Sequence, residues 1–375
     1  MDFAPSELQQ LLKEQAERFI EREYGFEQRR ALVSSARGYS EAHWKTFAEL
    51  GWLGLPFAEE VGGFGGTAAD LSVLFEVFGH GLVVEPYLAT VLGGLAVQRG
   101  GTPAQQQAIL PALIAGTHKL ALASTETGGR RGGLYVATRA KKVTGGWQLS
   151  GQKTVVLHGA CADTLVVSAR CHGAFDATGG IGLFLVPARA HGVGRRDYRT
   201  IDGLRAADIT LDRVELRDDA LLGEPTGGYA LLDELLDLAA LAGCAEALGC
   251  MQALIDRTAE YLRTREQFGR KIGQFQVLQH ALVDMFIAAE QARSLTLAAT
   301  LKAAAPAAER RRLVAAARQF SADAGRLVGQ SAVQLHGGIG VTDELDVAHY
   351  FKRLTMLPAW FADNGQPLDR FQADD

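Results

Sequence analysis

The segment RTREQFGRKIGQFQVLQH at residues 263–280 gathers side chains that could bind a nucleotide. Arg265, Gln267, Phe268 and Gln276 crowd around a glycine turn between two helical stretches. An arginine at such a turn can hold a pyrophosphate through paired hydrogen bonds, while an aromatic ring lies against an adenine or a ribose. The same residues also fit a capped loop between helices whose cations are simply solvated. Taken by itself, the segment leaves both interpretations equally open.

A second glycine-rich segment, QLHGGIG at residues 334–340, repeats this theme. Gln334 supplies an amide, and Gly337 and Gly338 permit a close approach of the backbone to a ligand. His336 could be catalytic, but a lone histidine before a glycine turn is usually structural. A helix, a glycine turn and a further helix equally describe a plain hinge.

The C-terminal segment LPAWFADNG at residues 357–365 contains a candidate general base. Asp363, if buried beside Trp360 and Phe361, would have its pKa raised by desolvation, which suits a base. The aspartate and the Asn-Gly that follows it also describe a solvated turn, which is the usual role of such a trio. The segment therefore indicates either an unusual acid or a site that has lost its acid.

The composition of the chain excludes several classes of protein. Its 375 residues are 47% hydrophobic and 22% charged, which is ordinary for a soluble globular protein. The formal net charge of -5 argues against a nucleic-acid partner, because such a protein needs a basic face. The motifs GxSxG, HExxH and GxxxxGK[ST] are absent, which removes the commonest catalytic signatures.

The cysteines show no metal-site pattern. Cys161, Cys171, Cys244 and Cys250 form no CxxC pair and have no histidine at zinc-ligand spacing, so we expect buried thiols and no metal. The N-terminal residues lack a basic start followed by an apolar run. The most apolar run, residues 238–255, contains a glutamate and fits a buried bundle helix better than a membrane span. These features predict a cytoplasmic protein with no membrane partner.

Three segments of different periodicity must position the candidate residues. Residues 1–117 show helical spacing, with Ser6 and Ser40 as expected N-caps. Residues 118–225 contain strand-like runs separated by glycine-rich turns, without the alternation with helices that a βαβ arrangement needs. Residues 226–375 return to long amphipathic helical stretches with short links, as in a bundle. We therefore predict an α+β fold with an N-terminal all-helical domain, a middle antiparallel β-domain and a C-terminal helical bundle.

The strongest periodic runs give individual predicted elements. The predicted strands are residues 146–157, 163–170, 180–188 and 207–216. The predicted long helices are residues 229–265, 276–304 and 309–335, with a turn at Pro306 before the last of them.

Together, these motifs resemble those of the acyl-CoA dehydrogenase family. RTREQFGRKIGQFQVLQHALVDM resembles its Arg-x-Gln-Phe-Gly … Phe-Gln … Asp-Met signature, and QLHGGIGVTDEL resembles its later Gln-x-x-Gly-Gly-x-Gly signature. GLPFAEEVGGFGG is similar to its N-terminal turn, and STETGG to a degraded form of its Thr-Glu-Pro-Gly strand end. The resemblance covers nearly the whole chain. It implies a four-helix bundle at the C-terminus, FAD as cofactor, and removal of two hydrogens from an acyl-CoA thioester.

The resemblance also implies roles for single residues. In relatives each FAD lies across a subunit boundary of a tetramer, and the neighbouring subunit clamps its adenosine diphosphate end. The positions of this chain that match the family's cofactor-binding residues are Arg265, Gln267, Phe268, Gln276, Gln334, Gly337, Gly338 and Thr125. Of these, Arg265, Phe268, Gln276, Gln334 and Gly338 would form the clamp, with Gln267 beside it, whereas Thr125 belongs to the β-domain.

Positions that serve a subunit's own flavin and substrate have changed. The family's usual base, the glutamate of a Tyr-Glu-Gly-Thr turn, falls on Phe361, and a phenyl ring cannot accept a proton. A second family location for the base falls on Ala239, and the arginine usual beside it falls on Ala240. The tryptophan and the threonine that contact the flavin in relatives are replaced by Val155 and Leu157.

This pattern of loss and retention predicts a non-catalytic subunit, since drift in a flavin-free protein would damage both sets of positions alike. The chain resembles the small subunits of heteromeric enzymes of the pimeloyl-CoA dehydrogenase type. That resemblance implies a heterotetramer in which a larger acyl-CoA dehydrogenase subunit supplies the flavin site and the base. Two alternatives stay open: a self-sufficient homo-oligomer in which a two-residue shift brings Asp363 to the base position, and a flavin-free assembly scaffold.

Overall fold

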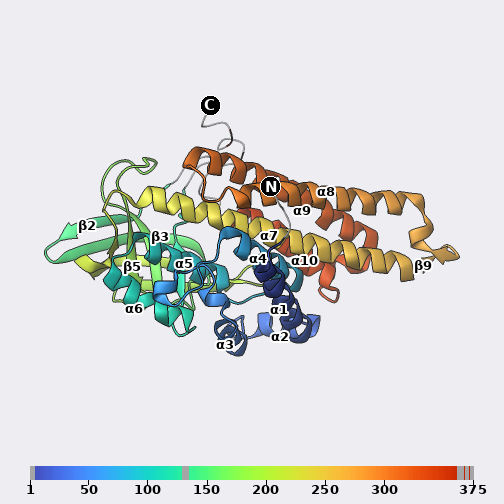
Figure 1. Ribbon diagram of the computed structural model, residues 1–375, viewed down its shortest axis with the longest axis horizontal. Helices are drawn as coiled ribbons and strands as arrows, with labels where there is room; N and C mark the ends of the chain where they lie inside the picture. The colour runs from blue at the N-terminus through green and yellow to red at the C-terminus, as the bar shows by residue number, and fades with distance from the viewer. Residues whose placement is uncertain (1–4, 129–134, 361–366, 368–370, 372–375) are drawn as a thin grey trace.

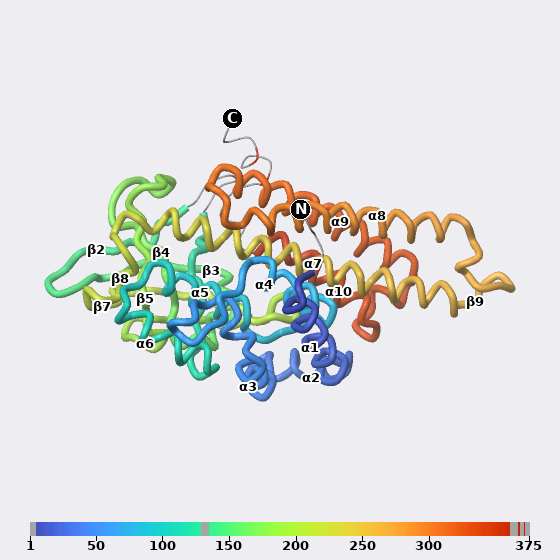
Figure 2. Tube along the Cα trace, viewed as in Figure 1, coloured from blue at the N-terminus to red at the C-terminus, as the bar shows by residue number. Residues whose placement is uncertain are grey.

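Helices occupy both ends of the chain and a β-sheet lies between them, as Figure 1 shows. This computed structural model describes residues 5–128 and 135–360, together with 367 and 371. The predicted α+β fold and the order of its helical and β segments are confirmed. The sheet and a small β-hairpin lie at opposite ends of the molecule's long axis, and the longest helices run between them (Figures 1 and 2).

Two of the N-terminal helices begin at the N-caps that the sequence predicts. The Ser6 hydroxyl accepts a hydrogen bond from the backbone of Gln9, whose side chain accepts one from the backbone of Ser6. Ser40 caps the third helix through the backbone of His43. The elements of this domain are α1 (Glu7–Glu23), α2 (Phe26–Ser34), α3 (Glu41–Glu49), η1 (Trp52–Gly54), η2 (Glu59–Val61), α4 (Ala68–Gly81), α5 (Tyr87–Gly100) and α6 (Pro103–Ile114).

The middle of the chain forms an eight-stranded sheet in the order β6-β7-β3-β2-β4-β5-β8, with β1 beside β4. Most neighbours are antiparallel, as predicted, but β1 and β2 each pair with β4 in parallel. Parallel pairing needs a long connection, and the whole β2–β3 hairpin separates β1 from β4 along the chain. The strands are β1 (Leu120–Ala123), β2 (Arg139–Val143), β3 (Gly146–Leu157), β4 (Thr164–Arg170), β5 (Ile181–Pro187), β6 (Val193–Arg199), β7 (Arg205–Arg217) and β8 (Leu221–Leu222), with η3 (Asp218–Ala220) before β8.

Within residues 226–360, four helices form the C-terminal bundle. The 37-residue helix α7 is long and apolar enough to cross a membrane, but 83% of its most apolar window is buried against the rest of the chain. Burial in the bundle is what the sequence predicts for this run. The elements are α7 (Gly228–Thr264), β9 (Glu266–Gln267), β10 (Arg270–Lys271), η4 (Ile272–Gln274), α8 (Gln276–Leu301), α9 (Ala307–His336), η5 (Gly337–Val341), α10 (Asp346–Met356) and η6 (Leu357–Ala359).

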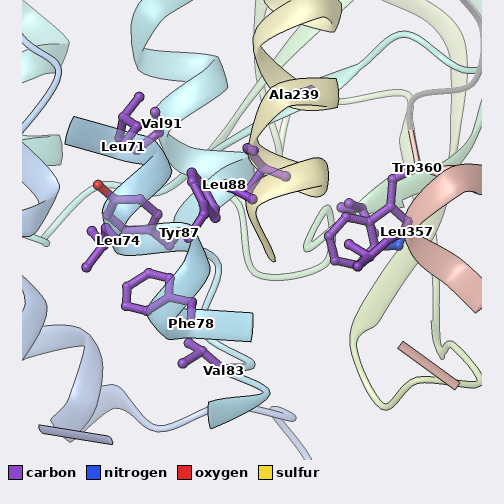
Figure 3. Packing of buried hydrophobic residues seen from close by; sticks show 14 of the residues in the cluster. Leu71, Leu74, Phe78, Val83, Tyr87, Leu88, Val91, Ala239, Leu357 and Trp360 are labelled. Atoms are coloured by element: carbon purple, nitrogen blue, oxygen red, sulfur yellow. The ribbon is translucent and has the colours of Figure 1, made fainter. Parts of the chain in front are cut away.

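One hydrophobic core runs from the N-terminal helices through α7 into the bundle, and a second core fills the sheet. Figure 3 shows part of the first core, where side chains of α4 and α5 lie near Ala239 of α7 and Trp360. The prediction of buried thiols is confirmed for Cys244 and Cys250. It is wrong for the other two cysteines, which lie in or next to the sheet domain's outer turns and are half-buried.

Candidate functional site

Beyond the end of α7, strands β9 and β10 form a hairpin whose turn consists of Phe268 and Gly269. Both residues have positive φ, at 56° and 74°. A two-residue turn of this kind matches the twist of a hairpin and requires left-handed backbone at both positions. Glycine adopts that conformation freely, whereas a phenylalanine adopts it only at a conformational cost.

The hairpin holds Phe268 at its tip with 90% of its surface exposed. The ring meets Phe275 edge to face, with 6.1 Å between centroids, and the Arg270 guanidinium lies 4.1 Å from the Phe275 ring centroid. An exposed ring gains little from the hydrophobic effect, and here its backbone is also strained. The arrangement is therefore suited to a molecule that covers the ring from outside.

The hairpin region also carries a local excess of positive charge. Arg263, Arg265, Arg270 and Lys271 are all exposed, and the nearby acid on the hairpin is Glu266. Within the described part of the chain, none of these four cations forms an ion pair. A group of arginines that have no internal partner is suited to binding a phosphate or pyrophosphate.

The glycine turn after α9 lies at the same end of the bundle. Tyr261, one helical turn before the hairpin, stacks on the His336 ring with 4.4 Å between centroids. Gln334, Gly337 and Gly338 are exposed here. A Cβ atom on Gly338 would meet no described atom within 4 Å, and its φ is outside the left-handed region, so nothing within the described chain requires glycine there. Open space above a glycine allows a ligand to approach the backbone closely.

At the hairpin end of the bundle, His336, Gln267 and Gln276 either make local contacts or are exposed. His336 is buried, its Nδ1 lies 2.8 Å from the Ala332 carbonyl oxygen, and burial lowers its pKa. These contacts favour the structural interpretation of this histidine. Gln276 is the exposed first residue of α8, and the Gln267 amide donates to the backbone oxygen of Glu266 at 2.8 Å. The structure thus brings seven of the eight predicted cofactor residues to one end of the bundle.

The eighth, Thr125, lies in the sheet domain, just after β1. Its carbonyl oxygen accepts a hydrogen bond from the Thr154 amide at 2.8 Å. Val155, which follows Thr154 on β3, has a φ of 51° and is 42% exposed, whereas Leu157 is buried. These two positions, expected to contact a flavin, offer neither an aromatic ring nor a hydroxyl group.

A buried ion pair fixes the strand end that carries Thr125. Lys153 of β3 has no exposed side-chain surface, and its Nζ lies 2.6 Å from Glu126 Oε1 and 2.9 Å from Ser168 Oγ. Glu126 also accepts hydrogen bonds from two backbone amides just before β2. A buried pair is stable when its remaining hydrogen-bonding groups are satisfied in this way. Sequence reasoning missed this pair because its members are 27 residues apart.

A pocket of about 220 Å³ opens between α7, α9 and the segment after α10, and we call it the outer pocket. Ala239 and Ala240, one expected location of the base, line it together with Trp360, the residue before the other location. Figure 3 shows Trp360 beside Leu357 and across from Ala239. The polar residues of its wall are Cys244, Arg318, Gln319, Ser321 and Arg326. No carboxylate is among the described lining residues, and Asp363 falls outside the residues that the structure describes.

A smaller cavity of about 30 Å³, the inner cavity, lies on the other side of Trp360. It has room for about two water molecules. Burial raises the pKa of Glu85 in its wall to about 8 and lowers that of His158 to about 3, so both side chains are neutral near pH 7. Glu85 Oε2, His158 Nδ1 and Trp360 Nε1 are buried and have no hydrogen-bond partner within the described part of the chain.

A buried charge network borders the inner cavity. Arg353 of α10 pairs with Glu246 of α7 and, at 2.8 Å, with Asp202 of the turn before β7. Its guanidinium carbon lies 5.5 Å from the Trp360 ring centroid. Arg29 of α2 donates to the Asp202 carbonyl oxygen at 3.0 Å. The network joins all three segments of the chain, and one usable sequence signal for it was the single acid in the apolar run ALAGCAEALGC.

Models of three domains from one family match this chain. The acyl-CoA dehydrogenase N-terminal domain matches residues 6–117, the middle domain residues 121–215 and the C-terminal domain residues 226–361. The chain belongs to the acyl-CoA dehydrogenase family. Members of this family are FAD-dependent oxidoreductases.

Individual relatives span nearly the whole chain. The probable acyl-CoA dehydrogenase YngJ of Bacillus subtilis is 30% identical over 368 residues, which are 95% of each protein. A chain of the ChsE4-ChsE5 complex from Mycobacterium tuberculosis has a TM-score of 0.88 at 27% identity, covering 100% of this chain and 97% of that one. A chain of a variant Tcur3481-Tcur3483 steroid ACAD has a TM-score of 0.86 at 31% identity, covering 97% and 96%.

An acyl-CoA dehydrogenase needs groups for both halves of FAD, and the residues predicted to contact the two halves differ in what they offer. The unpaired cations of the hairpin, the exposed Phe268 ring and the open space over Gly338 fit a diphosphate and an adenosine. Val155 and Leu157 do not fit a flavin ring in the way expected from relatives, because they offer no stacking surface and no hydrogen-bond donor from their side chains.

Proposed function

We propose that this chain is the non-catalytic subunit of a heteromeric acyl-CoA dehydrogenase. Its hairpin binds the adenosine diphosphate half of an FAD whose flavin and base belong to a larger partner subunit. The complex removes two hydrogens from an acyl-CoA thioester, and FAD supplies the hydride acceptor. Arg265 binds the diphosphate, Phe268 covers the adenosine, and the backbone at Gly338 approaches the cofactor.

The exposed cationic hairpin carries this proposal. It concentrates four cations on a chain of net charge -5 and holds a phenyl ring in water, and the nearby glycine turn after α9 leaves open space over Gly338. None of these features stabilises the free chain. Each becomes favourable when an anionic, aromatic ligand covers this end of the bundle.

The outer pocket supports the non-catalytic part of the proposal. A general base must lie within hydrogen-bond reach of the proton that it removes. Ala239 and Ala240 cannot act as bases, and the described wall of the pocket has cations and neutral groups but no carboxylate.

An apolar surface on α8 supports assembly with another subunit. Val277, Val283, Phe286 and Ile287 are all exposed on this helix, which begins at the hairpin. Large apolar side chains that are exposed along one helix are typical of a protein interface. The ChsE4-ChsE5 complex and the Tcur3481-Tcur3483 steroid ACAD, whose chains resemble this one, each carry the names of two proteins, which supports a heteromeric assembly.

The deciding experiment measures FAD in the complex reconstituted with a larger acyl-CoA dehydrogenase subunit. The substitution Arg265→Ala removes the charge-assisted hydrogen bonds to the diphosphate, so we expect the FAD dissociation constant to rise roughly 10- to 100-fold. Arg217→Ala is the matched control, since this exposed arginine pairs with Asp219 at the sheet end of the molecule. Unchanged FAD affinity in Arg265→Ala would exclude the clamp.

The absorption spectrum of the chain purified alone separates the alternatives. We expect a colourless protein that acquires flavin only with its partner. Flavin that is bound by the chain alone and bleached by acyl-CoA without oxygen would instead indicate a homo-oligomeric enzyme, and Asp363→Asn would then abolish the bleaching. A complex that assembles fully without any flavin would indicate an assembly scaffold.

A further inference from the structure

The outer pocket and the inner cavity share one wall. Of the described residues, Trp360 alone lines both of them. Its ring lies between the two spaces and is 8% exposed. Figure 3 shows the ring beside Leu357, with Ala239 and Leu88 on the facing side. The ring is therefore the partition between the outer pocket and the inner cavity.

The position of the Trp360 ring is set by packing against its neighbours and not by a hydrogen bond from its indole nitrogen. The buried Nε1 atom has no partner among the described residues. The Arg353 guanidinium, 5.5 Å from the ring centroid, is fixed by the carboxylates of Asp202 and Glu246. A cation held against an indole ring favours this one placement of the ring. The partition is thus a fixed part of the structure.

The two spaces differ in chemistry. The outer pocket has polar groups on α9, among them Arg318 and Arg326, and it faces solvent. The inner cavity is lined by apolar side chains, among them Phe75, Phe78, Val83, Leu88, Leu157 and Leu204, and Glu85, His158, Glu246 and Arg353 complete its wall. Together they would form one site for a molecule with a polar head and a hydrocarbon tail.

We propose that Trp360 determines the specificity of this chain by closing its site to hydrocarbon tails. The head of an acyl thioester fits the outer pocket, while the ring occupies the path that the tail would take into the inner cavity. A smaller residue at this position joins the two spaces and creates a site for linear acyl chains. This inference rests on the proposed function, in which acyl oxidation belongs to the partner, but its test requires no flavin.

The test compares octanoyl-CoA with CoA as ligands of the full chain by isothermal titration calorimetry. We expect wild type to bind the two with dissociation constants that agree within about threefold. Trp360→Ala should bind octanoyl-CoA at least tenfold more tightly than CoA, since each buried methylene group contributes about fourfold. Apolar cavities made by truncation do take up apolar ligands. Trp360→Leu, which keeps an apolar side chain in the core, should show the same preference and serves if the alanine variant is unfolded.

Trp147→Ala is the matched control. This tryptophan is 7% exposed, has the Lys142 ammonium 4.7 Å from its ring centroid, and lines neither space. We expect no preference for octanoyl-CoA in this variant. An equal gain in Trp147→Ala, a tenfold preference already present in wild type, or no preference in a folded Trp360 variant would each overturn the inference. FAD content after Arg265→Ala is independent of all three results, so the two proposals fail separately.

Discussion

Among single residues, Glu85 shows most clearly how surroundings set a charge state. Its Oε1 accepts a hydrogen bond from the Ser40 amide at 3.2 Å and lies 3.3 Å from His43 Nδ1. Burial raises the pKa of Glu85 to about 8 and lowers that of His43. Near neutral pH the two side chains are therefore an uncharged pair, although their proximity suggests an ion pair.

This charge state predicts a pH-dependent stability. Between the pKa of about 4.3 in the unfolded chain and about 8 in the folded chain, only the folded chain holds the proton, so the free energy of unfolding falls as pH rises. Relative to Glu85→Gln, which stays neutral, wild type should lose up to about 1.4 kcal/mol per pH unit in that window. Urea denaturation at pH 5, 6, 7 and 8 measures the difference.

Glu49→Gln is the control for that experiment. Glu49 is exposed and pairs with Lys45 at 3.4 Å, so its substitution should give a small difference that is nearly constant across the same pH range. A constant difference for Glu85→Gln as well would show that Glu85 is ionised throughout.

The grouping of the hairpin residues could be predicted from residue types and spacing because all of them lie within one short segment. Arg265, Gln267 and Phe268 are close together in the sequence, so they lie close together in space in any fold of the chain. Glu85 and Trp360 are different, because their surroundings come from several segments that are far apart in the sequence. Their burial, and hence the partition and the raised pKa, could not be predicted before the fold was known.

At the level of elements, α4 and α7 cross with their backbones in close contact. A Cβ atom on Gly79 would lie 1.9 Å from the Glu246 carbonyl oxygen, and one on Gly249 would lie 1.8 Å from that of Glu76. Each helix thus uses a glycine to admit the backbone of the other. Gly243, six residues earlier on α7, has only an ordinary contact of 3.9 Å.

These two glycines of α7 predict opposite effects of the same substitution. Gly243→Ala should stabilise the protein by up to about 1 kcal/mol, because alanine favours the helical conformation. Gly249→Ala should destabilise it by roughly 1–3 kcal/mol, because the added methyl group forces two backbones apart. Chemical denaturation of both variants measures the contrast. Stabilisation of Gly249→Ala would show that the crossing is loose.

The long helices could be predicted from sequence and several strands could not. The helix predicted at residues 229–265 is observed at Gly228–Thr264, because an apolar pattern sustained over ten turns is unambiguous. β3 was also predicted, as the run GWQLSGQKTVVL. β6, with the sequence VGRRDYR, has no such alternation and forms because β7 supplies its hydrogen-bonding partner. A sheet edge of this kind depends on tertiary pairing.

For the whole molecule, the Arg353 network joins the three parts of the fold. The side chain of this arginine is 1% exposed and its ion-pair partners, Glu246 and Asp202, belong to the bundle and the sheet domain. Arg29 extends the network to the N-terminal helices. A buried charge that loses its partner costs far more than an exposed one.

Arg353→Met should therefore destabilise the protein by about 3–5 kcal/mol, because two carboxylates are left buried without a counter-charge. Adding Glu246→Gln to this variant should recover part of the loss, which a double-mutant cycle would measure. Arg18→Met, which breaks an exposed pair with Glu14, should cost less than about 1 kcal/mol. A loss no larger than that control would show that the network carries little of the stability.

The length of helix α7 bears on how many chains contribute to one cofactor site. With 37 residues it is about 55 Å long, and it begins beside Ile181 of the sheet and ends at the hairpin. One chain therefore cannot supply its own sheet and its own hairpin to the same dinucleotide. In the complex that we propose, each complete cofactor site therefore uses two chains in contact, and this chain provides one hairpin. When it is the limiting component, loading of FAD should stop at its own molar amount, however large the excess of partner.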